Sequence, residues 1–316
     1  MNPIRSITHP ARLIHDFAQE VDGFLIRRTS LGPRGEICAL AVNEDPSPDL
    51  EMSFDVDTKT AYTYKIIRQS EHALQSWELK ARYGHFYFYQ PIGPDFALLV
   101  CARSQRYSQD RYDLNAKVFD TTGTLIREFL LGDGIQDLKV TDTSSIWTSY
   151  FDEGIAGNFG WERNDPVGAP GVILWDQYGS QQYAYPQTVE HLIDDCYAMN
   201  VVSDSEVWFY FYTDFDLAHF TNGQIEYMPI PVDGADGFVV YRDYFLFRGG
   251  YEDQNQYRLF QKQKGGHVQL ITEVEFVDNH GNPLTPNWVD CRGDELLMQQ
   301  KTASYVVNLR DVLYDM

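Results

Sequence analysis

The sequence predicts an all-β fold built from repeated four-stranded antiparallel units, and three observations support this. Runs rich in Val, Ile, Leu, Tyr, Phe and Trp recur along the 316 residues and are separated by Gly, Pro, Asn or Asp turns. Segments with helical periodicity are nearly absent, and the short candidate at residues 10–20 fits a strand equally well. One four-strand unit repeats with residues that align directly.

The repeat is clearest between residues 134 and 232. The segment Val140–Thr143 is followed by Ile146 and Trp147, and the segment Val202–Ser205 is followed by Val207 and Trp208. The Asp of each tight turn can bond its own backbone, and the Trp is large enough to fill the space between stacked sheets. A four-stranded repeat of about 40–50 residues is typical of a β-propeller blade.

The remaining chain divides in the same way, which predicts a six-bladed β-propeller of four-stranded antiparallel blades as a single domain over residues 1–316. The expected blades cover residues 19–81, 82–133, 134–187, 188–232, 233–286 and 287–316. The last blade has only three strands of its own. We therefore expect an N-terminal strand, residues 12–18, to complete it and to close the propeller.

Three segments resemble known propeller families. The aspartate–turn–tryptophan repeat resembles the propeller repeats of bacterial two-component regulator sensors, and Val207–Pro231 resembles a streptogramin-lyase-type repeat. The loop Phe151–Trp161 is similar to one in uncharacterised bacterial propeller proteins. These resemblances imply blade architecture. They imply no lyase activity, because the His and Glu pair of that family has no residue-by-residue match here.

Composition limits the classes of partner. The chain has 25 Lys and Arg against 46 Asp and Glu, a formal charge of −21, so nucleic acid is not expected as a partner. No apolar run reaches the ~18–20 residues of a membrane helix, and the N-terminus lacks the apolar stretch of a secretory signal. We therefore expect a cytoplasmic protein without a membrane partner. The charge favours a cationic small ligand or protein.

The four cysteines are predicted to be buried and reduced. Cys38, Cys101, Cys196 and Cys291 are widely separated, and three of them lie in apolar stretches, where a thiol behaves as a small hydrophobe.

One face of the predicted propeller carries long loops. Loops between the second and third strands of a blade share a face with the links between blades, and four of them are long: Asn43–Lys59, Arg103–Asp113, Asp152–Gly171 and Gly249–Gln256. Long loops in a compact domain are usually functional, so we expect a ligand- or protein-binding face. Strand ends on this face carry Tyr212, Asp214, Arg248 and Tyr251, a mixture that favours recognition.

Acidic residues recur on this face where the first strand of a blade begins. They are Asp22, Asp137, Asp195, Asp236 and Asp290, and His85 takes the place in the second blade. Around a central tunnel, Asp137, Asp195, Asp236 and Asp290 could bind Ca²⁺ or Mg²⁺, because crowded carboxylates attract a cation. Alternatively, each Asp caps backbone N–H groups and joins neighbouring blades. A metal with His85 as a base would suit a hydrolase or lyase, so an enzyme stays open as the alternative to a binding protein.

The Gly-rich loop Asp152–Trp161 is the second candidate site. Asp152, Glu153, Asn158 and Trp161 could supply acceptors, an amide and a stacking surface for a sugar, an amine or a peptide side chain. The alternative is a self-packed Ω-loop whose Trp fills its own base.

Overall fold

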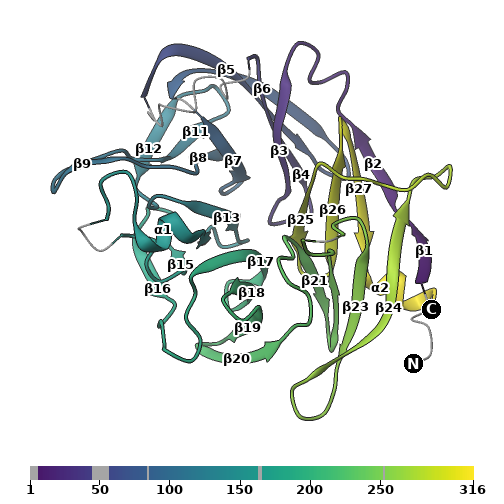
Figure 1. The fold of residues 1–316 in the computed structure, drawn as a ribbon. Helices are drawn as coiled ribbons and strands as arrows, with labels where there is room; N and C mark the ends of the chain where they lie inside the picture. The colour runs from purple at the N-terminus through teal and green to yellow at the C-terminus, as the bar shows by residue number, and fades with distance from the viewer. Residues whose placement is uncertain (1–5, 45–56, 84, 163–165, 252) are drawn as a thin grey trace. The chain divides into compact units, whose positions relative to one another are not determined.

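The computed structural model describes residues 6–44, 57–83, 85–162, 166–251 and 253–316. The chain divides into two compact units, which we call the middle unit (residues 19–196) and the terminal unit (residues 1–18 and 197–316). Both consist of small antiparallel sheets (Figure 1). Parts of three long loops predicted above lie outside the described residues, namely residues 45–56, 163–165 and 252. Gly84, in the predicted second blade, also lies outside them.

The middle unit contains three four-stranded sheets that follow one another along the chain. The first comprises β3 (Leu25–Leu31), β4 (Ile37–Val42), β5 (Asp57–Gln69) and β6 (Leu74–Tyr83). The second comprises β7 (Phe86–Pro91), β8 (Phe96–Cys101), β11 (Ala116–Asp120) and β12 (Leu125–Phe129). The third comprises β13 (Ile135–Val140), β14 (Ile146–Tyr150), β15 (Val172–Trp175) and β16 (Gln181–Ala184).

Two short insertions occupy the long loops of the middle unit. The loop between β8 and β11 forms a small hairpin of β9 (Arg106–Ser108) and β10 (Arg111–Tyr112). The loop between β14 and β15 begins with the one-turn helix α1 (Asp152–Ala156). Both insertions were expected only as irregular loops.

The terminal unit contains the other three sheets. The first comprises β17 (Asp195–Ser203), which starts at the unit boundary, β18 (Glu206–Tyr212), β19 (Asp216–Thr221) and β20 (Gln224–Pro229). The second comprises β21 (Phe238–Tyr241), β22 (Tyr244–Phe247), β23 (Tyr257–Lys262) and β24 (Val268–Val277). The third comprises β25 (Trp288–Arg292), β26 (Glu295–Gln300) and β27 (Ala303–Asn308), and is followed by helix α2 (Leu309–Tyr314).

The N-terminal residues add strands to two of these sheets (Figure 1). Strand β2 (Arg12–Asp16) pairs antiparallel with β27, with Leu13 opposite Tyr305, and completes the last sheet as predicted. Strand β1 (Ser6–Pro10) pairs parallel with β24 and forms a fifth strand there, which was not predicted. The fold class is thus confirmed: a six-bladed β-propeller of four-stranded antiparallel blades, closed by the N-terminal strand.

The repeated tryptophans occupy equivalent buried positions. Trp147 lies in β14 and Trp208 in β18, the second strand of each sheet, and they are 0% and 5% exposed. Trp208 packs against Phe245 of the following sheet, with ring centroids 5.3 Å apart. This confirms the alignment of the two repeats.

The cysteines also follow the prediction, since all four are buried thiols outside any disulfide. No helix in the described part of the chain has the length and hydropathy needed to cross a bilayer.

Candidate functional site

Asp137 of the middle unit is held by the protein's own cations. Its Oδ1 lies 3.5 Å from Nη2 of Arg28 and accepts from the Leu138 amide, and its Oδ2 lies 4.0 Å from Nζ of the fully buried Lys139. Arg28 belongs to β3 and Asp137 to β13, so the ion pair joins the first and third sheets. Asp137 is therefore engaged by the protein's own cations, and the two sheets that the ion pair joins are not consecutive along the chain.

Asp195 differs from Asp137 in its electrostatics. Burial, followed by the nearby charge of Asp152, raises the pKa of Asp195 from 3.8 to about 6. The charge of Asp152, a residue of the second predicted site, therefore acts on Asp195 of the first. A carboxyl group with this pKa can gain or lose a proton near neutral pH.

The remaining predicted positions of the middle unit lie at the starts of strands. His85 precedes β7 in a left-handed conformation, with φ 66°, and its ring lies 6.3 Å from that of Tyr62. Asp22 is exposed in the turn before β3.

Asp236 and Asp290 belong to the terminal unit and have different surroundings. Asp236 accepts from Nη1 of Arg248 at 2.9 Å, whereas Asp290 is 3% exposed within β25. Across the described ranges, no three His, Cys, Asp or Glu side chains form a group that could hold a metal ion. The predicted set of Asp137, Asp195, Asp236 and Asp290 therefore gains no support as a Ca²⁺ or Mg²⁺ site.

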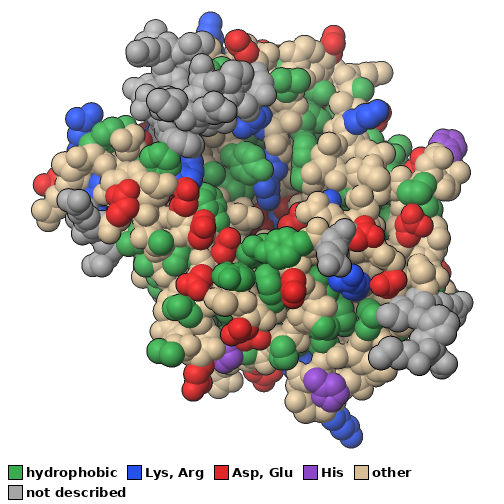
Figure 2. Space-filling model, in the orientation of Figure 1, with side chains coloured by type: hydrophobic (Ala, Val, Ile, Leu, Met, Phe, Trp, Pro, Cys, Tyr) green, Lys and Arg blue, Asp and Glu red, His purple; other side chains and the backbone are tan. Residues whose placement is uncertain are grey.

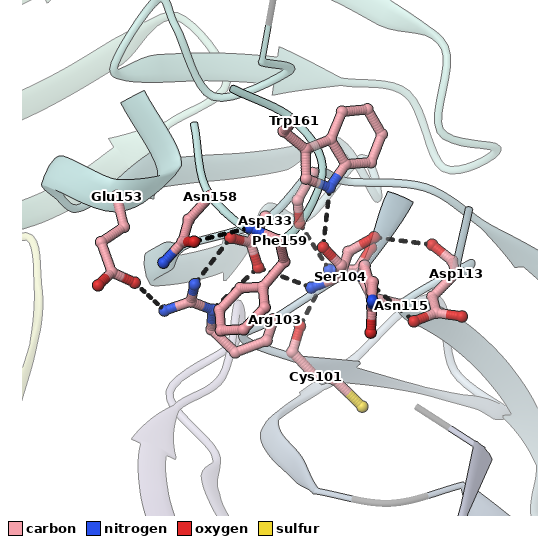
Figure 3. A network of polar contacts seen from close by, with 12 residues as sticks. Cys101, Arg103, Ser104, Asp113, Asn115, Asp133, Glu153, Asn158, Phe159 and Trp161 are labelled. Atoms are coloured by element: carbon pink, nitrogen blue, oxygen red, sulfur yellow. Dashed lines mark hydrogen bonds and ion pairs between the residues drawn. The ribbon is translucent and has the colours of Figure 1, made fainter. Parts of the chain in front are cut away.

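The loop Asp152–Trp161 is fixed by Arg103, at the end of the second sheet (Figure 3). The Arg103 guanidinium binds both carboxylate oxygens of Asp133 at 2.9 Å and donates to Oε2 of Glu153 at 2.5 Å. It also lies 4.3 Å from the centroid of the Phe159 ring. A planar guanidinium suits this combination of bidentate pairing and stacking.

Trp161 lies inside this network instead of on its surface. The indole is 3% exposed, and its Nε1 donates to the backbone oxygen of Ser104 at 2.8 Å. Gly154 of the same loop packs closely against the backbone of Asp133, because a Cβ at this position would lie 2.5 Å from the Asp133 carbonyl oxygen. Glu153 and Trp161 are thus engaged by residues outside the loop, and the tryptophan offers no exposed ring for stacking.

The terminal unit carries a group of aromatic side chains at the loop end of β18, which we call the aromatic cluster: Tyr197, Tyr212, Phe215 and Tyr251. Phe215 is central, with ring centroids 5.6 Å from Tyr197, 5.6 Å from Tyr212 and 6.2 Å from Tyr251. Tyr212 and Tyr251 are 42% and 63% exposed. Figure 2 shows hydrophobic side chains at the surface over this sheet with carboxylates beside them.

Arg248 and Gly234 position Tyr251. Arg248 is 3% exposed; besides Asp236, it binds the backbone oxygens of Gln254 and Pro286. It therefore braces the loop that follows β22 and offers no free guanidinium to a ligand. Gly234 has φ +75°, and a Cβ there would lie 2.4 Å from the Tyr251 ring, so only glycine lets the two loops pack.

A charge signal in the sequence marks this region and was missed above. Residues 197–241 contain no Lys or Arg and seven acidic residues: Asp204, Glu206, Asp214, Asp216, Glu226, Asp233 and Asp236. Asp214 lies beside Phe215, and Asp233 accepts the Tyr251 amide on its backbone oxygen; both are exposed. Scanning the charge along the chain, in addition to counting it, would have pointed to the aromatic cluster.

The chain was also compared with known proteins. No curated protein matches the sequence. The Cps50 (Swd1) β-propeller domain of Myceliophteria thermophila is 8% identical, with a TM-score of 0.49 over 94% of this chain and 99% of that one. Regucalcin, a calcium-binding protein of Agrobacterium tumefaciens, is 12% identical, with a TM-score of 0.49 over 96% and 95%.

A further solved structure, YCF48 bound to D1 peptide, is 9% identical, with a TM-score of 0.45 over 96% of this chain and 97% of that one. A model of the YxzG family matches residues 169–307. The chain is a β-propeller protein that matches the YxzG family over these residues.

Proposed function

We propose that this chain is a binding protein, and that the aromatic cluster recognises a cationic segment of a partner protein. The observation that carries the proposal is the exposure of Tyr212 and Tyr251. Tyr212 lies in residues 197–241, a segment without Lys or Arg, and Tyr251 lies in the loop after β22 that packs beside it. A β-propeller fold is consistent with such a role.

The chemistry of the aromatic cluster favours Arg or Lys side chains. Tyrosine rings present an apolar body and a hydroxyl, and their faces attract a cation placed within about 6 Å. The Tyr197 and Tyr251 hydroxyls bond each other, which fixes the two rings relative to one another, and Tyr251 is 63% exposed. Asp214 and Asp233 add negative charge at the edge of the aromatic cluster, where it steers a basic partner.

The breadth of the aromatic cluster favours a polypeptide over a single small cation. The rings come from β17, from the end of β18 and the turn that follows it, and from the loop after β22. A segment with two or more basic residues could contact the separate rings together. Protein interfaces commonly depend on a few such exposed Tyr anchors.

The test begins with a random peptide library displayed on phage and selected on the folded protein. We expect the selected peptides to be enriched in Arg and Lys. Affinity for one synthetic selected peptide should fall at least tenfold in Tyr251→Ala or Tyr212→Ala, because loss of an interface Tyr anchor commonly costs about 2 kcal/mol.

Tyr178→Ala is the matched control, since Tyr178 is also 63% exposed but lies in the middle unit, in the turn between β15 and β16. It should leave the affinity unchanged. Selection of neutral or acidic peptides would overturn the proposal, as would equal binding by Tyr212→Ala and wild type. Circular dichroism of each variant separates loss of binding from loss of folding.

A further inference from the structure

A cavity of about 460 Å³ lies at the other end of β18 from the aromatic cluster. Strand β18 begins at Glu206, in the cavity wall, and ends at Tyr212, so the two places are ~20 Å apart at ~3.3 Å per residue. Residues of all three sheets of the terminal unit contribute to the wall. This cavity is separate from the proposed protein-binding surface.

Two aromatic surfaces line the cavity. The rings of His219 and Trp208 stack in parallel, with centroids 3.6 Å apart and planes 7° apart. Oε1 of Glu206 lies 3.2 Å from Nε2 of His219 and 3.3 Å from Nε1 of Trp208, which fixes the stack. The Trp208 ring is 5% exposed and the His219 side chain 18%, so the imidazole is the more accessible member. The second surface is the ring of Tyr241.

The cavity contains charges of both signs, and most are paired within the protein. Lys262 Nζ lies 3.3 Å from Oε2 of Glu226, and Arg310 donates to Asp294. The guanidinium of Arg310 also lies 5.0 Å from the centroid of the Tyr241 ring. These pairs leave the turn between β21 and β22 as the place where the cavity can offer charge to a ligand.

That turn presents Arg242 and Asp243, both exposed and both in the cavity wall. Within the described ranges, neither has an ion-pair partner. Arg242 adopts φ 56°, which is unfavourable for a residue with a Cβ, and its guanidinium lies 5.1 Å from the centroid of the Tyr241 ring. The turn thus offers one positive and one negative group beside an aromatic surface.

We propose that this cavity binds a small zwitterion that carries a planar ring, the chemical class that includes the aromatic amino acids. The carboxylate of the ligand pairs with Arg242, and its ammonium group with Asp243. Its ring lies against the aromatic surfaces of His219 and Tyr241. The cavity lining combines the rings of Trp208, His219 and Tyr241 with charged side chains of both signs, so it can contact both the ring and the two charges of such a ligand.

Three probes with the same ring test the charge requirement. L-Phenylalanine carries both charges, 3-phenylpropanoate lacks the ammonium group, and 2-phenylethylamine lacks the carboxylate. Binding is followed by the ¹⁵N–¹H resonance of the Trp208 indole in the full-length protein. We expect L-phenylalanine to bind at least tenfold more tightly than either analogue, since each charge-assisted hydrogen bond contributes about tenfold or more. Equal binding of either analogue, or no response to any probe, would overturn the proposal.

Variants locate the site. Arg242→Gly removes the guanidinium while keeping a backbone that tolerates positive φ, and Asp243→Asn removes the carboxylate. Each variant should weaken L-phenylalanine binding about tenfold. Arg242→Gly should leave the affinity for 2-phenylethylamine unchanged, and Asp243→Asn should leave the affinity for 3-phenylpropanoate unchanged. Lys264→Ala is the matched control, because Lys264 is exposed in the turn between β23 and β24 and is not part of the cavity lining.

Lys264→Ala should bind L-phenylalanine as wild type does, and a loss equal to that of Arg242→Gly would show a net-charge effect and overturn the site. Tyr251→Ala should also bind normally. Because the cavity and the aromatic cluster lie at opposite ends of β18, failure of peptide selection leaves this test unaffected, and failure of the amino-acid titration leaves the peptide test unaffected.

Discussion

Arg103 binds two carboxylates whose pKa values shift in opposite directions. Burial raises the pKa of Asp133 despite the adjacent guanidinium, whereas the hydrogen bond from Arg103, followed by one from Asn158, lowers the pKa of Glu153. The side chain of Asp133 is 2% exposed and that of Glu153 46%, so desolvation outweighs the attraction at the first and not at the second. Arg103 therefore favours the charged form of both carboxylates, but only for Glu153 does this outweigh the cost of burial.

Asp195 gives a residue-scale prediction about pH. Its folded-state pKa of about 6 exceeds the ordinary 3.8, so the folded protein binds this proton more tightly than the unfolded chain does. The free energy of unfolding consequently falls as the pH rises through the window from 3.8 to 6, and the penalty is fully present above it. Asp195→Asn removes the penalty, so we expect a higher Tm than wild type at pH 7.5 and no such gain at pH 3.5.

Thermal unfolding followed by circular dichroism at both pH values measures this difference. Asp214→Asn serves as the control, since it removes an exposed carboxylate and should change Tm little at either pH. An equal gain from Asp195→Asn at both pH values would contradict the assignment of the effect to titration of this group.

The sequence identified the residues of the Asp152–Trp161 loop but not their partners. The Trp161 indole bonds the Ser104 backbone, 57 positions away, and Glu153 pairs with Arg103, 50 positions away. Residue type alone suggests a stacking surface for Trp161, whereas its burial is decided by a distant segment. Contacts of this kind cannot be predicted from local spacing.

The strands of the blades were predictable because each is bounded by turn residues and has a strongly apolar face. Strand β13 (Ile135–Val140), for example, lies between Gly134 and the turn at Asp142 and Thr143. Strand β1 was not predictable, since its sequence Ser-Ile-Thr-His-Pro is short and mostly polar. Its conformation depends on pairing with β24, which lies at the other end of the chain.

The N-terminal strands give a prediction at the element scale. Removing residues 1–11 takes away β1 and exposes the edge of β24, whereas removing residues 1–18 also takes away β2 and Phe17, which is 0% exposed. We expect the longer deletion to lower the free energy of unfolding by at least about 3–5 kcal/mol more than the shorter one, from loss of the buried ring alone.

Hydrogen exchange distinguishes the two deletions. Amides of β27 that face β2 should lose protection only in the longer deletion, and amides between β18 and β19 provide the internal reference. Unchanged protection of β27 after removal of residues 1–18 would contradict its pairing with β2.

At the scale of the whole molecule, the charge of −21 is unevenly distributed along the chain. Residues 197–241 have no Lys or Arg, while Arg242, Lys262 and Arg310 of the same unit line one cavity. The number of blades could be predicted from the repeat. The ion-pair partners of the repeated Asp residues could not, because the Arg28–Asp137 pair, for example, joins two sheets and residues 109 positions apart.

This charge distribution predicts how the association rate depends on salt. For a selected Arg- or Lys-rich peptide, we expect the association rate constant to fall about tenfold between low salt and ~0.5 M NaCl, because screening weakens steering by the acidic surface. The dissociation rate constant should change much less. Stopped-flow fluorescence measures both constants.

The double variant Asp214→Asn with Asp233→Asn should show a shallower salt dependence than wild type. An association rate constant that does not depend on salt would show that charge has no part in recognition of the peptide.

The pairing of β1 with β24 and of β2 with β27 also has a consequence for synthesis on the ribosome. Residues 6–16 are synthesised well before their partner strands, which lie at residues 268–277 and 303–308. At ~5–20 residues per second, residues 6–16 wait on the order of tens of seconds for these partners. Until then residues 6–16 have no sheet edge to join. Once β24 and β27 are made, any delay in pairing with β1 and β2 leaves their edges open to other nascent chains. Slow synthesis of residues 268–308, or a chaperone bound to residues 6–16, would leave these two sheet edges unpaired for longer. We therefore expect either one to lower the yield of folded protein.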